Sequence, residues 1–214
     1  MKFPVFDLHC DTPDVLMASN LYKNSGHIDL ERTSVFPAYA QCFACYTTTG
    51  EGNPVDAFEK KLAAILREIA KNENLIAQVF SGEDILRNAA DGKASAILTI
   101  EGPAGFGFDP DLLEDLRKVG FCMTTLGWNE SNVLTGSHIT GEGLTDLGRA
   151  YVRKAQRLGM IVDVSHISDA GFWDIMDITA APVVASHSNS RALCNISRNI
   201  TDEMFTKICE TDGV

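Results

Sequence analysis

Short apolar runs recur along the chain, and each is nearly free of polar residues. Runs of this kind are typical of strands that are buried on both faces of a parallel sheet. The predicted strands cover residues 5–8, 40–46, 95–100, 121–126, 160–164 and 182–185.

Amphipathic segments lie between these runs and predict helices. The clearest covers residues 56–71, where apolar side chains form a single stripe. Other helices are marked by residues that favour helix ends. These are Asp109-Pro110 and Gly120 for one helix, Thr145 and Gly159 for another, and Ser168 and Thr201 at the starts of two more.

Strand and helix alternate along the whole chain, which indicates an α/β fold with parallel strands. Such a sheet is either open and doubly wound or closed into a barrel. No G-x-G-x-x-G or G-x-x-x-x-G-K-[ST] motif follows any predicted strand, so a nucleotide-binding open sheet loses its main support. With no repeat, low-complexity tract or linker, residues 1–214 are expected to form a single domain.

Charge and hydropathy narrow the class of partner. The formal net charge of −11 argues against a nucleic-acid partner, because such binding depends on Lys and Arg neutralising phosphates. No apolar run approaches the roughly 18 residues of a membrane span, and the N-terminus lacks the pattern of a signal peptide. We therefore expect a cytoplasmic protein that acts on a small molecule.

The six cysteines mostly lie inside apolar runs, which favours reduced, buried thiols over disulfides. Cys42 and Cys45 form a C-x-x-C motif, which also permits a redox or zinc interpretation. However, residues three apart on a strand point to opposite faces, and no second C-x-x-C completes a zinc site. We therefore predict structural cysteines.

Five potential metal ligands share one position in the predicted topology. Each lies at the C-terminal end of a predicted strand, and in a barrel those ends converge on one mouth, where barrel enzymes keep their active sites. A single histidine at a strand end is more often a hydrogen-bonded core residue, so the argument rests on the coincidence of all five. They are His9, Asp11, Glu101, His166 and His187.

These residue types suit a pair of metal ions. His9 and Asp11 share a strand face about 6.5 Å apart, so one metal can contact both. Imidazole and carboxylate suit zinc, with manganese or iron as alternatives. Glu101 has two oxygens and can bridge two cations, and His166 and His187 complete the second site. A metal pair of this kind lowers the pKa of a shared water and polarises a carbonyl.

The two remaining histidines are weaker candidates. His27 lies in a polar loop and is expected at the surface. His138 lies in the long loop after the fourth predicted strand, where a contact with the substrate or with a metal ligand is a further alternative.

The motifs DLHCDT, TIEG, GLTDLGRAYVRKAQRLGMIVDVSH and ASHSNSRALCNISRN together resemble the membrane dipeptidase (renal dipeptidase) family of metallopeptidases, in the amidohydrolase superfamily. The resemblance runs from residue 6 to about residue 205. It implies a (β/α)8 TIM-type barrel with two zinc ions that hydrolyses dipeptides, often with a D-residue on the C-terminal side. It also implies the same five metal ligands, with Glu101 as the bridge.

The resemblance adds two substrate-binding residues. Arg198 matches the family arginine that holds the substrate carboxylate, a role that suits the two parallel hydrogen bonds of a guanidinium. Some family members have a substrate-binding histidine where this chain has Trp128, so Trp128 is expected to stack on the substrate or fill the mouth. Family members are often dimers, which allows for a homodimer here.

The sequence also departs from the family pattern. Six strands are expected instead of eight, so the barrel is expected to be truncated to about six βα units. The aspartate that serves the family as general acid/base, at the end of the eighth strand, is not found. The alternatives are therefore an inactive metal-binding remnant, another amidohydrolase-type amide hydrolase, or a nuclease of the same fold. The absence of lysine from residues 121–128 argues against a carbamylated-lysine amidohydrolase, and the acidic charge argues against a nuclease.

Overall fold

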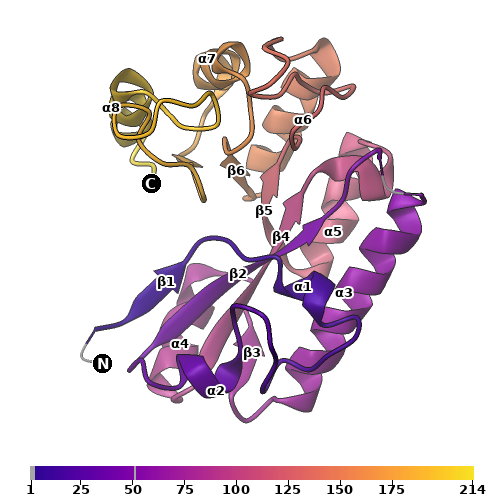
Figure 1. Ribbon diagram of the computed structural model, residues 1–214, viewed down its shortest axis with the longest axis vertical. Coiled ribbons are helices and arrows are strands. Elements are labelled where there is room, and N and C mark those ends of the chain that lie inside the picture. The colour runs from indigo at the N-terminus through magenta and orange to yellow at the C-terminus, as the bar shows by residue number, and fades with distance from the viewer. Residues whose placement is uncertain (1–2, 51) are drawn as a thin grey trace.

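The computed structural model describes residues 3–50 and 52–214 (Figure 1). Its described strands form one parallel sheet in the order β1-β2-β4-β5-β6-β7, with β3 also paired to β4. The strands are β1 (Val5–Asp7), β2 (Tyr39–Tyr46), β3 (Ile76–Gln78), β4 (Ala94–Glu101), β5 (Phe121–Thr125), β6 (Ile161–Asp163) and β7 (Val183–Val184).

All six predicted strands are confirmed, and β3 is an addition. Strand β2 pairs with β4 in continuous register from Ala40 opposite Ser95 to Tyr46 opposite Glu101. The other edge of β4 is shared: β3 pairs with its first residues, and β5 pairs with its last four. Strand β3 has only three residues, so it forms no apolar run long enough to be recognised in the sequence.

The helices lie between successive strands, except α8, which follows β7. They are α1 (Thr12–Val15), α2 (Leu30–Thr33), α3 (Pro54–Lys71), α4 (Gly82–Ala90), α5 (Leu113–Val119), α6 (Asp146–Arg157), α7 (Asp169–Ile178) and α8 (Asp202–Glu210), with 3-10 turns η1 (Pro103–Phe106) and η2 (Pro110–Leu112). The predicted caps are confirmed, because the side chains of Thr145, Ser168 and Thr201 each accept a backbone N–H in the first turn of α6, α7 and α8.

The structure refines one helix and adds another. The helix expected from Asp109 has the predicted cap and the predicted end at Gly120, with φ of 111°, but its first turn is the 3-10 turn η2 and it becomes α-helical only from Leu113. Helix α4 was not predicted from the sequence. Its start is a capping box, in which Ser81 and Asp84 satisfy each other's backbone N–H groups.

The core lies mainly between the sheet and the helices. Alternate side chains of β2 and β4, such as Cys45 and Leu98, pack against apolar residues of α3, α6, α7 and α8 in one large cluster. The opposite side chains, such as Cys42 and Ile97, form a smaller cluster on the other face. The sheet therefore has helices on one face and a narrow interior on the other, as in part of a TIM-type barrel, which confirms the predicted fold class.

The two clusters also show that the cysteines of the C-x-x-C motif do not act as a pair. Cys42 and Cys45 lie on opposite faces of β2, and all six cysteines are free thiols. Burial raises the pKa of the Cys45 thiol to about 12 and that of Cys42 further still, so both are unreactive at neutral pH. Across residues 3–50 and 52–214, we find no helix of the length and hydropathy that a membrane crossing requires.

Candidate metal centre

The sheet curls so strongly that side chains from its two ends meet. Strands β1 and β7 lie at opposite ends of the strand order, five spacings apart, which would be about 24 Å on a flat sheet. Yet the rings of His9, two residues beyond β1, and His187, three residues beyond β7, stack with centroids 3.6 Å apart and planes at 16°. The C-terminal ends of the strands therefore converge, as expected for a barrel mouth.

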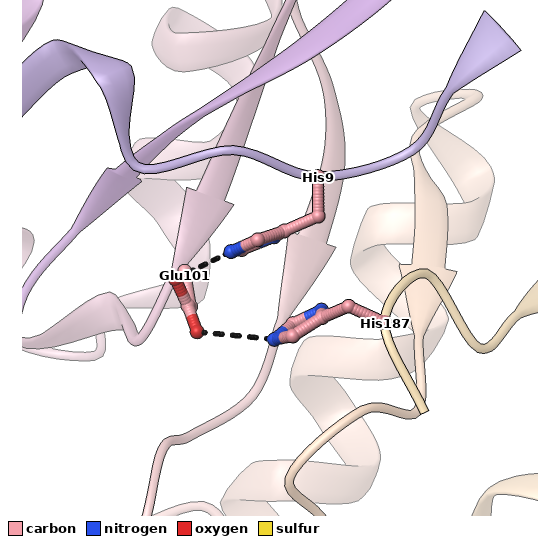
Figure 2. A group of neighbouring side chains, drawn as sticks. All are labelled: His9, Glu101 and His187. Carbon is pink, nitrogen blue, oxygen red and sulfur yellow. Dashed lines mark ion pairs between the residues drawn. The ribbon is translucent and has the colours of Figure 1, made fainter. Parts of the chain in front are cut away.

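Glu101 lies at the centre of this convergence, as the last residue of β4 (Figure 2). One carboxylate oxygen, Oε2, lies 3.3 Å from Nε2 of His9. The other oxygen, Oε1, lies 3.1 Å from Nε2 of His166 and 3.5 Å from Nε2 of His187. The two oxygens therefore face two separate groups of imidazole nitrogens.

The remaining predicted ligand, Asp11, joins the first of these groups. Its Oδ1 lies 3.4 Å from Nε2 of His9, although its side chain is 63% exposed. In the second group, Nε2 of His166 and Nε2 of His187 are 2.8 Å apart. The structure thus brings all five predicted ligands together. Of these, His9, Glu101 and His187 have ligand atoms within 4.8 Å of one another.

The electrostatic environment of the cluster favours a cation. Burial lowers the pKa of His9, but hydrogen bonds to Asp11 and Glu101 outweigh burial and raise that pKa to about 10. Burial raises the pKa of Glu101, but the three histidines outweigh it and hold that pKa far below the ordinary value. A negative potential that retains a proton on His9 near the carboxylates also attracts a metal ion at that point.

Residues that the sequence analysis did not single out orient His187. Its Nδ1 lies 2.7 Å from Oγ of Ser186, which in turn donates to Oδ2 of Asp163 at 2.5 Å. Asp163 is 1% exposed and also accepts the backbone N–H groups of Ser165 and Ser186, both at 3.0 Å. Since the Ser186 hydroxyl proton goes to Asp163, Nδ1–H of His187 is the donor to Ser186, and Nε2 is the ring nitrogen that faces the cluster. The signal in the sequence was a carboxylate inside the apolar run 160–164.

His166 is oriented in a comparable way by the loop after β5. Its Nδ1 lies 2.9 Å from Oδ1 of Asn129, an atom that also lies 2.9 Å from Nε2 of His138. Burial, aided by the charge of Arg198 and opposed by Glu101, lowers the pKa of His166. His27 is exposed, as expected.

Arg198 and Trp128 lie beside the cluster. Arg198 is half-buried and donates to Oγ of Ser188 at 2.8 Å, and burial lowers its pKa. Its loop is held by Arg191, which forms two 2.7 Å hydrogen bonds to Asp169. The ring of Trp128 lies 5.1 Å from that of Tyr46 in an edge contact and 6.2 Å from that of His166.

Comparisons with known proteins agree on one family. The family model described as membrane dipeptidase (peptidase family M19) matches residues 1–214. The fold is similar to that of a metallo peptidase from Rhodobacter sphaeroides, solved with a phosphinate mimic of the dipeptide L-Ala-D-Ala. The two share 26% identity with a TM-score of 0.89, over 99% of this chain and 72% of that chain.

Two relatives extend the comparison. Dipeptidase tcpJ of Claviceps purpurea (strain 20.1) is 28% identical over 208 residues, which cover 89% of this chain and 48% of the relative. A protein of Acinetobacter calcoaceticus named for the PQQ-III 3' region is 28% identical over 247 residues, covering 99% of this chain and 78% of the relative. The chain therefore spans from about half to about three quarters of the length of these proteins. Matched by the family model from its first residue to its last, it belongs to the membrane dipeptidase family of hydrolases, peptidase family M19.

Proposed function

We propose that the chain is a zinc-dependent dipeptidase that holds two metal ions, with Glu101 as the ligand shared between them. The distances between donor atoms carry this proposal. In tetrahedral zinc with ligand bonds of about 2.0–2.1 Å, neighbouring donor atoms lie roughly 3.3 Å apart. Here Nε2 of His9 lies 3.4 Å from Asp11 and 3.3 Å from Glu101, while Oε1 of Glu101 lies 3.1 and 3.5 Å from His166 and His187.

These four separations fit one ion on each oxygen of Glu101, whereas the Nε2 atoms of His166 and His187, 2.8 Å apart, would move apart to bind the second ion. His9 and Asp11 would hold the first ion, and His166 and His187 would hold the second. When bound, such a pair supplies an ionised water at neutral pH and polarises a carbonyl. The protein contributes fixed donors, because Ser186 and Asn129 each leave Nε2 of a histidine directed at the cluster.

The substrate would be a dipeptide whose free carboxylate binds Arg198. The guanidinium is half-buried, which strengthens its interaction with an anion. Its charge lowers the pKa of His138 as a secondary effect after burial, so its field extends across the mouth. Trp128 and Tyr46 would form an apolar wall beside the peptide bond. The phosphinate mimic of L-Ala-D-Ala bound by the Rhodobacter peptidase supports a D-residue at the C-terminal side.

The test is hydrolysis of L-Ala-D-Ala and L-Ala-L-Ala by the purified protein with added zinc, together with metal analysis. About two zinc ions per chain and turnover of L-Ala-D-Ala are expected. Two bound ions without turnover of either dipeptide would contradict the enzymatic part and favour a metal-binding protein. Absence of bound metal would contradict the whole proposal.

Arg198→Lys should raise KM for L-Ala-D-Ala by about tenfold, because lysine offers a point charge in place of two parallel hydrogen bonds. The zinc content should stay the same. The matched control is Arg153→Lys, at an exposed arginine on α6, which should leave KM unchanged. An unchanged KM in Arg198→Lys would remove Arg198 from the binding site.

Ser186→Ala should weaken zinc binding by about 10- to 100-fold, because His187 loses the acceptor that fixes its ring. Affinity can be measured by competition with a chromophoric chelator. Ser34→Ala, which removes an exposed hydroxyl at the end of α2, is the control. Equal affinities in the two variants would show that Ser186 does not orient His187.

A further inference from the structure

Asn129 occupies a central position between two histidines, although it is four residues beyond the end of β5 and outside the proposed ligand set. Its Oδ1 lies 2.9 Å from Nδ1 of His166 and 2.9 Å from Nε2 of His138. On its far side, His138 places Nδ1 3.0 Å from Oγ of Ser197. Four side chains therefore form one continuous hydrogen-bonded row, from the candidate metal ligand to the loop that carries Arg198.

We propose that Asn129 and His138 are positioning residues: they form a relay that directs Nε2 of His166 towards Glu101 and ties His166 to Ser197, the neighbour of Arg198. The proposal rests on the metal function proposed above, since His166 needs a free Nε2 lone pair only if it binds an ion. Neither residue is expected to touch the metal or the reacting atoms.

The donors and acceptors of the relay match only one arrangement of protons around the amide oxygen. An amide oxygen only accepts hydrogen bonds, so His166 donates from Nδ1 and presents Nε2 to Glu101. The same oxygen also accepts a hydrogen bond from Nε2–H of His138. Nδ1 of His138 then has the lone pair and accepts the hydroxyl proton of Ser197. Asn129 thus sets the tautomers of both histidine rings.

The backbone supports the same connection. His166 has φ of 69°, in the left-handed region that non-glycine residues seldom adopt, and such conformations persist where the surroundings hold them. Its carbonyl accepts the N–H of His138 at 2.9 Å, within an antiparallel bridge between Ser137 and Ile167. The loop that contains Asn129 and His138 therefore grips His166 through both its ring and its backbone.

The first test measures zinc affinity by chelator competition. Asn129→Leu removes the acceptor and should weaken zinc binding by about 10- to 100-fold. Asn129→Asp keeps an acceptor oxygen in the same place and should bind zinc at least as tightly as the unmodified chain. Ser131→Ala is the matched control, because it removes hydrogen bonds to Thr140 and Glu142 within the same loop without contact with the relay. Wild-type affinity in Asn129→Leu, or equal losses in the Leu and Asp variants, would overturn the proposal.

The second test needs no variant and no activity. Long-range 1H–15N spectra of histidine-labelled protein distinguish the two ring tautomers. With zinc bound, His138 should carry its proton on Nε2 and His166 on Nδ1. The opposite tautomer at His138 would overturn the relay even if every variant failed to fold.

The link to the substrate loop is tested by His138→Ala. Loss of the hydrogen bond to Ser197 should raise KM for L-Ala-D-Ala by about 2- to 12-fold, with a smaller change in kcat. A fall in kcat at constant KM would contradict this part.

Failure of the relay can be distinguished from failure of the proposed dipeptidase function. Zinc binding and the expected tautomers without dipeptide turnover would reject the dipeptidase function and keep the relay. Turnover with unchanged zinc affinity in Asn129→Leu would reject the relay alone.

Discussion

Glu101→Gln is expected to abolish tight zinc binding and to lower kcat/KM for dipeptides by about a thousandfold, the rate factor for roughly 4 kcal/mol of lost charge stabilisation. The amide keeps the size of the side chain, but it loses the negative charge and one of the two acceptor oxygens. Since Oε2 faces His9 and Oε1 faces His166 and His187, either orientation of the amide places an NH2 group against imidazole nitrogens. This one substitution therefore weakens both proposed metal sites, the one beside His9 and the one beside His166 and His187.

A matched control exists elsewhere in the core. Glu68 is 1% exposed and accepts the N–H of Leu21 at 2.9 Å, away from the strand ends. Glu68→Gln should lower stability but leave zinc content and KM unchanged. If Glu101→Gln retained two zinc ions and wild-type turnover, the shared-ligand role of Glu101 would be wrong.

Gly102→Ala is expected to lower the free energy of unfolding by about 3 kcal/mol or more, a large effect for one methyl group. Gly102 has φ of 78°, and a Cβ there would lie 2.2 Å from the carbonyl oxygen of Thr47. The carbonyl is backbone and the position of a Cβ is fixed by its own backbone, so the clash can be relieved only if the chain moves. Because Gly102 directly follows Glu101, that movement should also displace the carboxylate and weaken zinc binding.

The control separates the clash from the backbone strain. Gly92 has φ of 70°, but a Cβ there meets nothing within 4 Å. Gly92→Ala should therefore cost only the strain of the left-handed conformation, about 1–2 kcal/mol. Urea denaturation of both variants gives the difference. Equal losses of stability would show that the close approach of Thr47 to Gly102 has no energetic consequence.

The strands and the position of the candidate site could be predicted because both depend on simple repeating features. Continuous apolar runs identified every strand except β3, and the residues just beyond those runs included all five candidate ligands that the structure brings together. This worked because the ends of parallel strands meet at one edge whatever the details of packing. Strand β3 is short because it shares an edge of β4 with β5, which is a property of the whole sheet.

The residues that orient the ligands could not be predicted in the same way. Asn129 contacts His166 across 37 positions of sequence, and Asp163 contacts Ser186 across 23. Such contacts depend on how separate loops pack, and loop packing produces no periodic pattern in the amino-acid sequence. Arg198 and Trp128 were found only through the family resemblance, and their substrate roles stay predictions. The same holds for the cytoplasmic location and the homodimer.

The stacked rings of His9 and His187 imply that the proposed metal site joins the first and last strands of the sheet. Strands β1 and β7 share no hydrogen-bonded ladder with each other, so contacts at the strand ends, this stack among them, connect them. Two bound ions, joined through Glu101, would then act together as a reversible cross-link between His9 and His187. Because the ions bind the native state only, stability would rise with free zinc, by about 2.7 kcal/mol for each ion at a hundred times its Kd. Zinc supply would thus govern the stability of the fold as well as its chemistry.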